Sequence, residues 1–277
     1  MGIHAQSNCM TDALSLRAMC LILFAWRSHP RYPLVVAANR DEFHNRPTAA
    51  ASYWKESPQL LAGRDLQAGG TWLGITRQGR FAAITNYREP QGEEPLLEQS
   101  RGHLVRDFLL DKAIPADYAS KLRQQGGKYR GFNVLLGDLS TLVYVSNRNE
   151  ETVVVNAGSH GLSNHLLDTD WPKVHAGRAH LDTLLEDESV DPEALLELLA
   201  ARDVVSGREP PGFELQLAPE LITRMMFIVS PDYGTRSSTV LLADRDGSVT
   251  FVERQFDATG MASGTRSHKF QITRELD

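Results

Sequence analysis

The stretch CLILFAWRSHPRYPLVVAANRDE, residues 20–42, decides the fold. Two short apolar runs, residues 20–26 and 33–39, flank a segment rich in turn-forming residues. Apolar runs of this length, bounded by turn residues, predict two antiparallel strands joined as a hairpin. The open ends of a hairpin lie side by side, so Cys20 is expected beside the polar residues that end the second strand.

The rest of the chain alternates between blocks of β-like runs and blocks of helical segments. Strands are expected at residues 71–76, 81–85, 133–138, 141–146, 151–156, 225–230, 238–243 and 249–256. Helices are expected at residues 100–110, 116–125, 171–185 and 192–200, and the last dozen residues show no clear pattern. This order predicts an α+β layered domain, most simply two antiparallel sheets with helices outside.

Length, charge and cysteine content narrow the class of protein. One domain over residues 20–277 accounts for the length, and no internal repeat suggests a second domain. The formal net charge of -6 argues against a nucleic-acid partner. No apolar run approaches the roughly twenty residues that a membrane helix needs. Cys9 and Cys20 give neither a disulfide framework nor metal-ligand spacing, so we expect a cytoplasmic protein that holds no metal. The expected partner is a small molecule.

Residues 1–19 lack the basic start and apolar core of a secretory signal. They are predicted to be a leader that is either absent from the working protein, through an upstream start codon, or disordered. Autocatalytic removal is a further alternative. Because Met19 directly precedes Cys20, a chain that starts at Met19 and loses its methionine would begin with this cysteine.

Cys20 has two interpretations. A lone cysteine that opens a strand is usually a small core residue. At a chain terminus, however, its thiol and its α-amine share one residue. A free α-amine has a pKa of about 7.7–8.0 and a free thiol one of about 8.5, so the amine can act as a base toward the thiol near neutral pH.

A polar cluster follows the second strand of the hairpin. A solvated loop is the ordinary outcome for such a charged run. The hairpin, however, brings Asn39, Arg40 and Asp41 close to Cys20. A carboxylate there can hold an ammonium group, and an arginine can stabilise a thiolate.

Three further polar residues stand at the ends of β-like runs: Asn86, Asn164 and Arg236. Asparagine in a loop is most often a turn former. The alternative is a role in an oxyanion hole, which requires neutral hydrogen-bond donors such as the asparagine amide.

Several motifs in this order resemble the NRDE family, also described as the transport and Golgi organisation protein 2 family. They are MCLILFAW, ANRDEFHNRP, GGTWLGITRQGRFAAITNYREP, SRGHLVRDFL, YRGFNVLLGD, GLSNHLLDTDWPKV and YGTRSSTVLL. The match runs from residue 19 to about residue 256. The family in turn is similar to N-terminal nucleophile hydrolases of the choloylglycine hydrolase and penicillin V acylase type. The resemblance therefore implies a four-layer αββα sandwich.

The resemblance also implies a role for each candidate site residue. Cys20 corresponds to the nucleophile and Asp41 to the aspartate that holds its amine. Asn164 and, by a looser match, Asn86 correspond to the oxyanion asparagines, and Arg236 to the late arginine at the head of a strand.

One position departs from the hydrolase pattern. The hydrolases carry an arginine two places before Arg40, where this chain has Ala38. Asn39 and Arg40 are therefore expected only as residues that could line the site.

Two functions follow from these residues. The first is an amide hydrolase that acts on a small N-acyl substrate and requires no cofactor. The second is a non-catalytic protein that binds or transports haem or acyl-CoA-type lipids on the same scaffold, as is said of the eukaryotic relatives. His160 and His165, which flank the GLSN motif, are the candidate haem ligands, although loop histidines are usually solvated.

Overall fold

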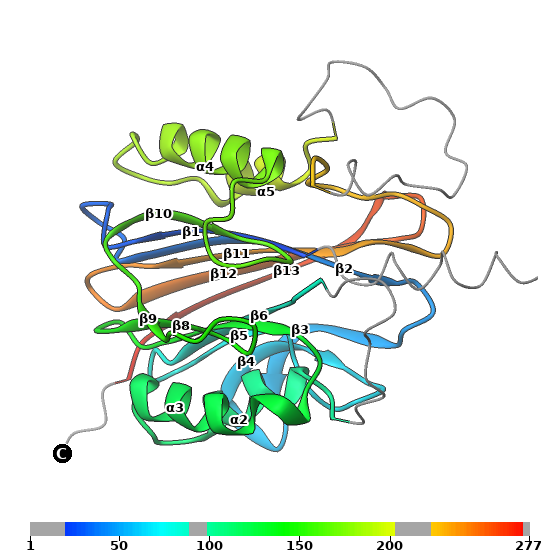
Figure 1. The fold of residues 1–277 in the computed structure, drawn as a ribbon. Helices are drawn as coiled ribbons and strands as arrows, with labels where there is room; N and C mark the ends of the chain where they lie inside the picture. Colours follow the sequence, from blue (N-terminus) through cyan, green and yellow to red (C-terminus); the bar gives the residue numbers. More distant parts are fainter. Residues whose placement is uncertain (1–19, 89–98, 203–222, 274–277) are drawn as a thin grey trace, which may run out of the picture.

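Two antiparallel β-sheets lie face to face, with helices on both outer faces (Figure 1). The computed structural model describes residues 20–88, 99–202 and 223–273, so the predicted leader lies outside the described residues. The predicted four-layer αββα sandwich is confirmed.

The first sheet has six strands in the order β10-β1-β2-β11-β12-β13. Their bounds are β1 Leu21–Trp26, β2 Leu34–Phe43, β10 Gly158–Leu162, β11 Tyr233–Ala243, β12 Ser248–Phe256 and β13 Ala262–Gln271. The second sheet has seven strands in chain order from β3 to β9. Their bounds are β3 Thr48–Trp54, β4 Ser57–Asp65, β5 Leu73–Thr76, β6 Phe81–Asn86, β7 Phe132–Gly137, β8 Leu142–Ser146 and β9 Val153–Val154.

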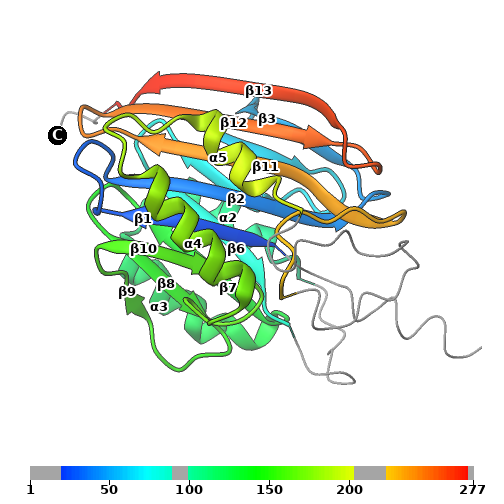
Figure 2. The same cartoon turned by 90° about the horizontal axis from the view of Figure 1, so that it is seen from above.

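Among the described residues, two helices cover each sheet. Helices α4 (Pro172–Leu184) and α5 (Pro192–Leu199) lie across the first sheet, over β10, β1, β2 and β11 (Figure 2). Helices α2 (Gly102–Leu110) and α3 (Pro115–Gln125) cover the second sheet, and a short 3-10 turn, η1 (Gly126–Lys128), follows α3. No helix in the described ranges is long and apolar enough to cross a membrane.

The predicted hairpin forms strands β1 and β2, with Leu21 opposite Asn39. Side chains alternate between the two faces of a strand. Ile22 and Phe24 accordingly belong to the core between the sheets, whereas Leu23 packs with Leu21 beneath α4 and α5. Both faces of the hairpin are buried, which explains why its apolar runs are continuous rather than alternating.

Four strands were not predicted: β3, β4, β10 and β13. The sequence of β3 and β4 contains short, small and polar residues that break the pattern of a buried strand. Strand β13 is an edge strand with a mostly exposed surface, so it lacks an apolar signal, and it includes part of the terminal stretch for which no pattern was expected. The strand expected at residues 151–156 is reduced to the two residues of β9.

The strand expected at residues 225–230 is wrong. This apolar stretch is irregular, and side chains satisfy part of its backbone, while one bond comes from β11, whose Thr235 N–H donates to the carbonyl of Ile228 at 2.9 Å. Asn39 Nδ2 donates to the carbonyl of Met226 at 2.8 Å, and the backbone N–H of Ile228 donates to Thr235 Oγ1 at 2.9 Å. The stretch is buried because it fills the space beside α4 and β11, and burial alone produced the strand-like pattern.

Candidate active site

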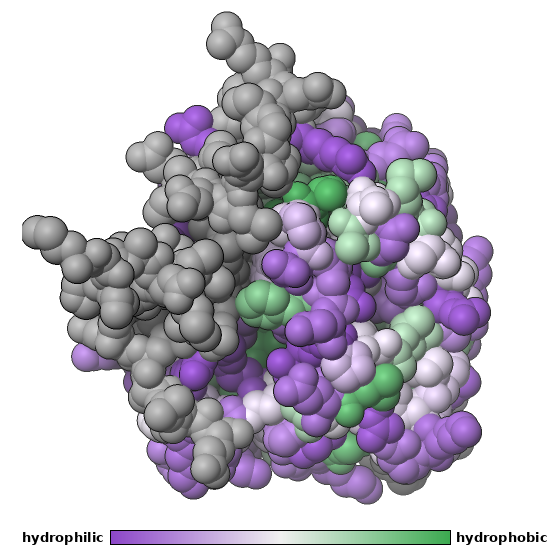
Figure 3. Space-filling view, turned by 90° about the vertical axis from the view of Figure 1, so that its right-hand side faces the viewer, coloured by the Kyte–Doolittle hydropathy of each residue, from purple (hydrophilic) through white to green (hydrophobic). Residues whose placement is uncertain are grey.

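A cavity of about 540 Å³ opens at the start of β1. Its walls come from both sheets and from the start of α2, and its lining includes Cys20, Arg40, Asp41, Glu42, Trp72 and Asn86. The described side chains on the face shown in Figure 3 are mostly hydrophilic, and the apolar ones form only small groups. The cavity itself is lined mostly by polar and charged residues.

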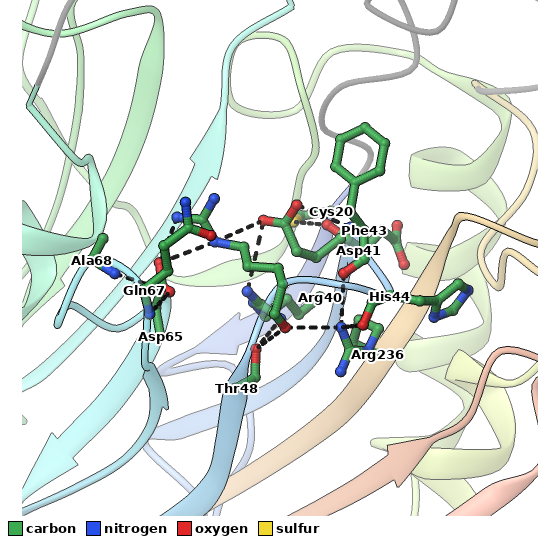
Figure 4. A network of polar contacts seen from close by, with 12 residues as sticks. Cys20, Arg40, Asp41, Phe43, His44, Thr48, Asp65, Gln67, Ala68 and Arg236 are labelled. Atoms are coloured by element: carbon green, nitrogen blue, oxygen red, sulfur yellow. Dashed lines mark hydrogen bonds and ion pairs between the residues drawn. The ribbon is translucent and has the colours of Figure 1, made fainter.

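Cys20 lies at the open end of the β1–β2 hairpin, one position before the pair formed by Leu21 and Asn39. Strand alternation turns its side chain toward the space between the sheets, where it lines the cavity. The thiol lies 3.9 Å from the backbone carbonyl oxygen of Asp41, and the backbone carbonyl of Cys20 accepts a hydrogen bond from Ser163 Oγ at 2.7 Å. The backbone of residue 20 is thus held on the β10 side, and its thiol contacts the β2 side, as Figure 4 shows for Cys20 and Asp41.

Asp41 holds a carboxylate whose two oxygens differ. Oδ1 accepts a hydrogen bond from Thr235 Oγ1 at 2.6 Å. Oδ2 is buried and has no hydrogen-bond partner among the described residues. Burial raises the pKa of Asp41 to about 7, although the Thr235 hydroxyl and the charges of Lys173 and Arg40 oppose this rise. An unpaired buried carboxylate oxygen is costly, so this atom is suited to receive a donor.

The thiol of Cys20 is not activated in the 277-residue chain. Burial raises its pKa to about 11, and the charge of Asp41 adds to the rise. The charge of Arg40 acts in the opposite direction. Only the thiolate is an effective nucleophile, so this form of the chain holds Cys20 in its unreactive, protonated state at neutral pH.

We expect the pH dependence of alkylation to reveal this difference. In the 277-residue chain carrying Cys9→Ser, labelling of Cys20 by iodoacetamide should rise with a midpoint near pH 11. In a protein that begins at Cys20, the α-amine can take the thiol proton, and the ammonium group formed in this way stabilises the thiolate, so the midpoint should fall by at least two pH units. Intact mass recorded across pH measures both midpoints. Equal midpoints in the two proteins would contradict the assigned environment of the thiol.

The two candidate asparagines join the sheets. Asn86 ends β6 and lines the cavity. Asn164 is fully buried after β10, and its Nδ2 donates to the backbone carbonyl of Asn86 at 2.9 Å. An amide nitrogen carries two N–H donors. One N–H of Asn164 is therefore committed to Asn86, and the predicted oxyanion role would fall to the other.

Arg40 reaches the site and forms part of its wall. Its guanidinium group stacks over the ring of Trp72, 4.3 Å from the centroid. It also donates to Thr48 Oγ1 at 3.3 Å and lies 3.7 Å from a carboxylate oxygen of Glu42. The stack on Trp72 and the charge pair with Glu42 hold the guanidinium group in place, and Figure 4 shows Arg40 among the polar contacts near Cys20.

Asn39 and Arg236 have other surroundings. Asn39 points toward the helices, where Nδ2 donates to the backbone carbonyls of Leu199 and Met226 and Oδ1 accepts from Ser238. Its polar atoms are occupied by these structural contacts.

Arg236 sits at a bulge in β11 and donates to the backbone carbonyls of Phe43, His44 and Arg46, the nearest at 2.8 Å. It lines a neighbouring cavity of about 390 Å³ rather than the one at Cys20. The described structure therefore does not bring all the candidate residues into one cavity. Arg236 instead holds the backbone that follows residues 39–42 through these hydrogen bonds.

Sequence reasoning missed three residues that surround Cys20 and Asp41. Ser163 and Thr235 make the hydrogen bonds described above. The third, Lys173, is fully buried in the first turn of α4. Burial lowers its pKa to about 8, while the charges of Asp41 and Cys20 raise it.

The candidate haem ligands are engaged in other contacts. His160 Nδ1 lies 2.7 Å from Asp168 Oδ2, and its Nε2 lies 3.0 Å from the carbonyl of Asn156. His165 Nδ1 lies 2.8 Å from Thr169 Oγ1. Within the described ranges, no group of three or more His, Cys, Asp or Glu side chains could hold a metal ion.

The layers, the strand-end cysteine and the aspartate beside it define the class of fold. The structure is similar to that of the Caenorhabditis elegans ortholog of N-acylethanolamine-hydrolyzing acid amidase, with a TM-score of 0.51 at 11% sequence identity. The match covers 80% of this chain and 92% of that chain. The fold is that of the N-terminal nucleophile hydrolases.

The sequence profile of the family Transport and Golgi organisation 2 matches residues 19–258. The Bos taurus Transport and Golgi organization protein 2 homolog is 38% identical over 278 residues, covering 92% of this chain and 99% of the relative. The Homo sapiens homolog is 35% identical with the same coverage. The chain belongs to the Transport and Golgi organisation 2 family, which confirms the resemblance drawn from the NRDE motifs.

Proposed function

We propose that the chain, once Cys20 is its first residue, is an amide hydrolase acting on a small N-acyl substrate. The observation that carries this proposal is the buried Oδ2 of Asp41, which lacks a hydrogen-bond partner among the described residues beside the start of β1. An α-amine at residue 20 is a donor of the right kind for that oxygen. The similarity of fold to an N-acylethanolamine-hydrolyzing amidase supports the same chemistry.

The reaction proceeds in two steps through a thioester. The neutral α-amine of Cys20 takes the proton of the thiol, and the thiolate attacks the carbonyl carbon of the amide. The tetrahedral oxyanion is stabilised by neutral donors, for which Asn86 and Asn164 are the candidates. The carbon–nitrogen bond then breaks, and the α-ammonium returns its proton to the leaving amine. Water, deprotonated by the same α-amine, hydrolyses the thioester, releasing the acid and restoring the thiol.

Trapping of the acyl-enzyme tests the proposal. A protein beginning at Cys20 is mixed with penicillin V, an N-acylethanolamine or an N-acyl amino acid, and quenched in acid for intact mass. We expect one acyl adduct on Cys20 and release of the free amine, with neither in Cys20→Ser. The 277-residue chain is the matched control and should form the adduct much more slowly. Absence of both adduct and hydrolysis across the panel would contradict an amidase.

The charges of the cavity suggest which amides bind best. Arg40, Arg46, Arg101 and Arg130 line it together with the acidic residues Asp41, Glu42 and Asp65. With Asp41 engaged beside Cys20, arginines outnumber the remaining carboxylates among the described residues that line the cavity. The proposed substrate therefore carries an anionic group.

We expect an N-acylglycine to have a kcat/KM about 3- to 10-fold above that of the matching N-acylethanolamine at low ionic strength, and salt to reduce this ratio. Steady-state kinetics at two salt concentrations measures it. A ratio below one at low salt would show that the arginines do not select the substrate.

The alternative, a non-catalytic protein for haem or acyl-CoA-type lipids, finds no support from His160, both of whose ring nitrogens are already bonded. A ligand that binds in the cavity without forming a Cys20 adduct is the result that would favour this alternative.

A further inference from the structure

Lys173 occupies a position that is unfavourable for a lysine. Its side chain is fully buried, whereas lysine is almost never fully buried unless it is paired. It also lies in the first turn of α4, where the helix dipole disfavours a cation. A buried cation at a helix N-terminus requires a compensating anion nearby.

The packing of α4 directs Lys173 toward the start of β1. One turn further along the helix, Gly177 rests on Leu23, so closely that a Cβ there would lie 2.7 Å from a Leu23 methyl group. Lys173 precedes Gly177 by four residues and therefore lies on the same face of the helix. It also interacts with the charge of Cys20, so it lies toward the end of β1 at which Cys20 is found.

Asp41 projects toward the same layer. Strand alternation in β2 turns Asn39 and Asp41 to the helix side of the sheet and Arg40 to the side of the cavity. The thiol of Cys20 also faces the cavity. Lys173 is not among the described residues that line this cavity, so it approaches the site from behind the sheet and out of reach of a substrate.

Within the described part of the chain, Lys173 and Asp41 share a small set of charged neighbours. Lys173 interacts with the charges of Asp41 and Cys20. Asp41 in turn interacts favourably with Lys173 and Arg40 and unfavourably with Glu42. Asp41 is thus a buried carboxylate whose charge acts on Lys173, and in a chain that begins at Cys20 it would face a second amine.

We propose that Lys173 is a positioning residue that serves as the counter-ion of Asp41 and thereby leaves the α-amine of Cys20 uncharged. The inference rests on the proposed function, because it concerns the base of that reaction. One carboxylate cannot neutralise two buried cations. The charged Lys173 ammonium group therefore disfavours a second positive charge on the α-amine of Cys20. The Asp41 carboxylate then accepts a hydrogen bond from a neutral α-amine, which keeps its lone pair for the thiol proton.

The test uses a protein that begins at Cys20, which contains a single cysteine because Cys9 is absent. Labelling with ¹³C,¹⁵N-cysteine then reports on residue 20 alone, and its chemical shifts across pH give the pKa of the α-amine. We expect Lys173→Met to raise this pKa by at least one unit, which is a tenfold change in proton affinity. Lys173→Arg should restore most of the original value. Lys121→Met, at an exposed lysine of α3, is the matched control and should change nothing.

The readout needs no turnover, so it remains decisive even if no amide is hydrolysed. Where turnover is found, the acidic limb of the pH–rate profile should move upward by the same amount in Lys173→Met. If Lys173→Met does not fold, Lys173→Gln provides the neutral side chain. An α-amine pKa that is unchanged in a folded neutral variant overturns the proposal.

Discussion

Replacement of Cys20 by alanine in the protein that begins at this residue is expected to abolish amide hydrolysis, by a factor on the order of 10⁴ or more. The nucleophile is lost and no neighbouring group can replace it, since Asp41 and Arg40 act only on the charge of the thiol. The fold should survive, because the change removes one sulfur atom from a partly exposed side chain at the end of a strand.

Hydrolysis rate and thermal unfolding, measured on the same preparations, check both halves of this expectation. Cys20→Ser is the matched variant, since it keeps the size of the side chain. If Cys20→Ala unfolds while the wild-type thiol resists alkylation at every pH, then Cys20 is a structural core residue and the proposed chemistry fails.

Replacement of Gly70 is expected to have the largest effect on stability. A Cβ at Gly70 would lie 2.5 Å from the backbone carbonyl carbon of Gly102 and 2.7 Å from its oxygen. Backbone cannot move aside as a side chain can, so the start of α2 must shift. Gly70→Ala should therefore lower the free energy of unfolding by about 2–3 kcal/mol, as overpacking does. The cavity should change as well, because Gly102 lines it.

Gly127→Ala is the matched control, since a Cβ there has nothing within 4 Å among the described residues. Chemical denaturation of both variants measures the difference. Equal stability of the two proteins would mean that the contact between residue 70 and α2 is looser than described.

The parts of the fold that depend on local pattern could be predicted. The β1–β2 hairpin has continuous apolar runs and a polar turn, and both features are local. Strand β3 could not be found because its small residues give little periodicity, and its place is set by pairing with β4. Residues 225–230 show the opposite failure, in which burial mimics a strand although side chains such as Asn39 satisfy the backbone.

The site residues also fall into two groups, those that a local pattern places and those that depend on how the sheets pack. Arg40 and Asp41 could be placed near Cys20 because the register of a hairpin is local. The nearness of Asn86 and Asn164 depends on how the sheets dock, which no local pattern records, so it was predicted only from their positions at the ends of β-like runs and from the family resemblance.

The surroundings of Arg236 could not be predicted from the sequence, whereas the burial of Lys173 could have been. The bulge in β11 directs Arg236 to the carbonyls that follow β2, and a bulge has no clear sequence signal here. The sequence did contain a signal for Lys173, because this residue stands four positions before Gly177 on the buried stripe of α4. A lysine on an apolar helical stripe could have been singled out for this reason.

The contacts that hold Cys20 and Asp41 also set when the site can exist during protein synthesis. Ser163 is 143 residues beyond Cys20, and Thr235 is 194 residues beyond Asp41. At about 5–20 residues per second, a ribosome needs roughly 10 to 40 s to pass from Asp41 to Thr235. Until β11 emerges and pairs with β2, the carboxylate lacks the hydroxyl that orients it. If the site itself removes the predicted leader, the cut must therefore come after translation has passed β11, and a nascent chain halted before that strand would keep its first residues.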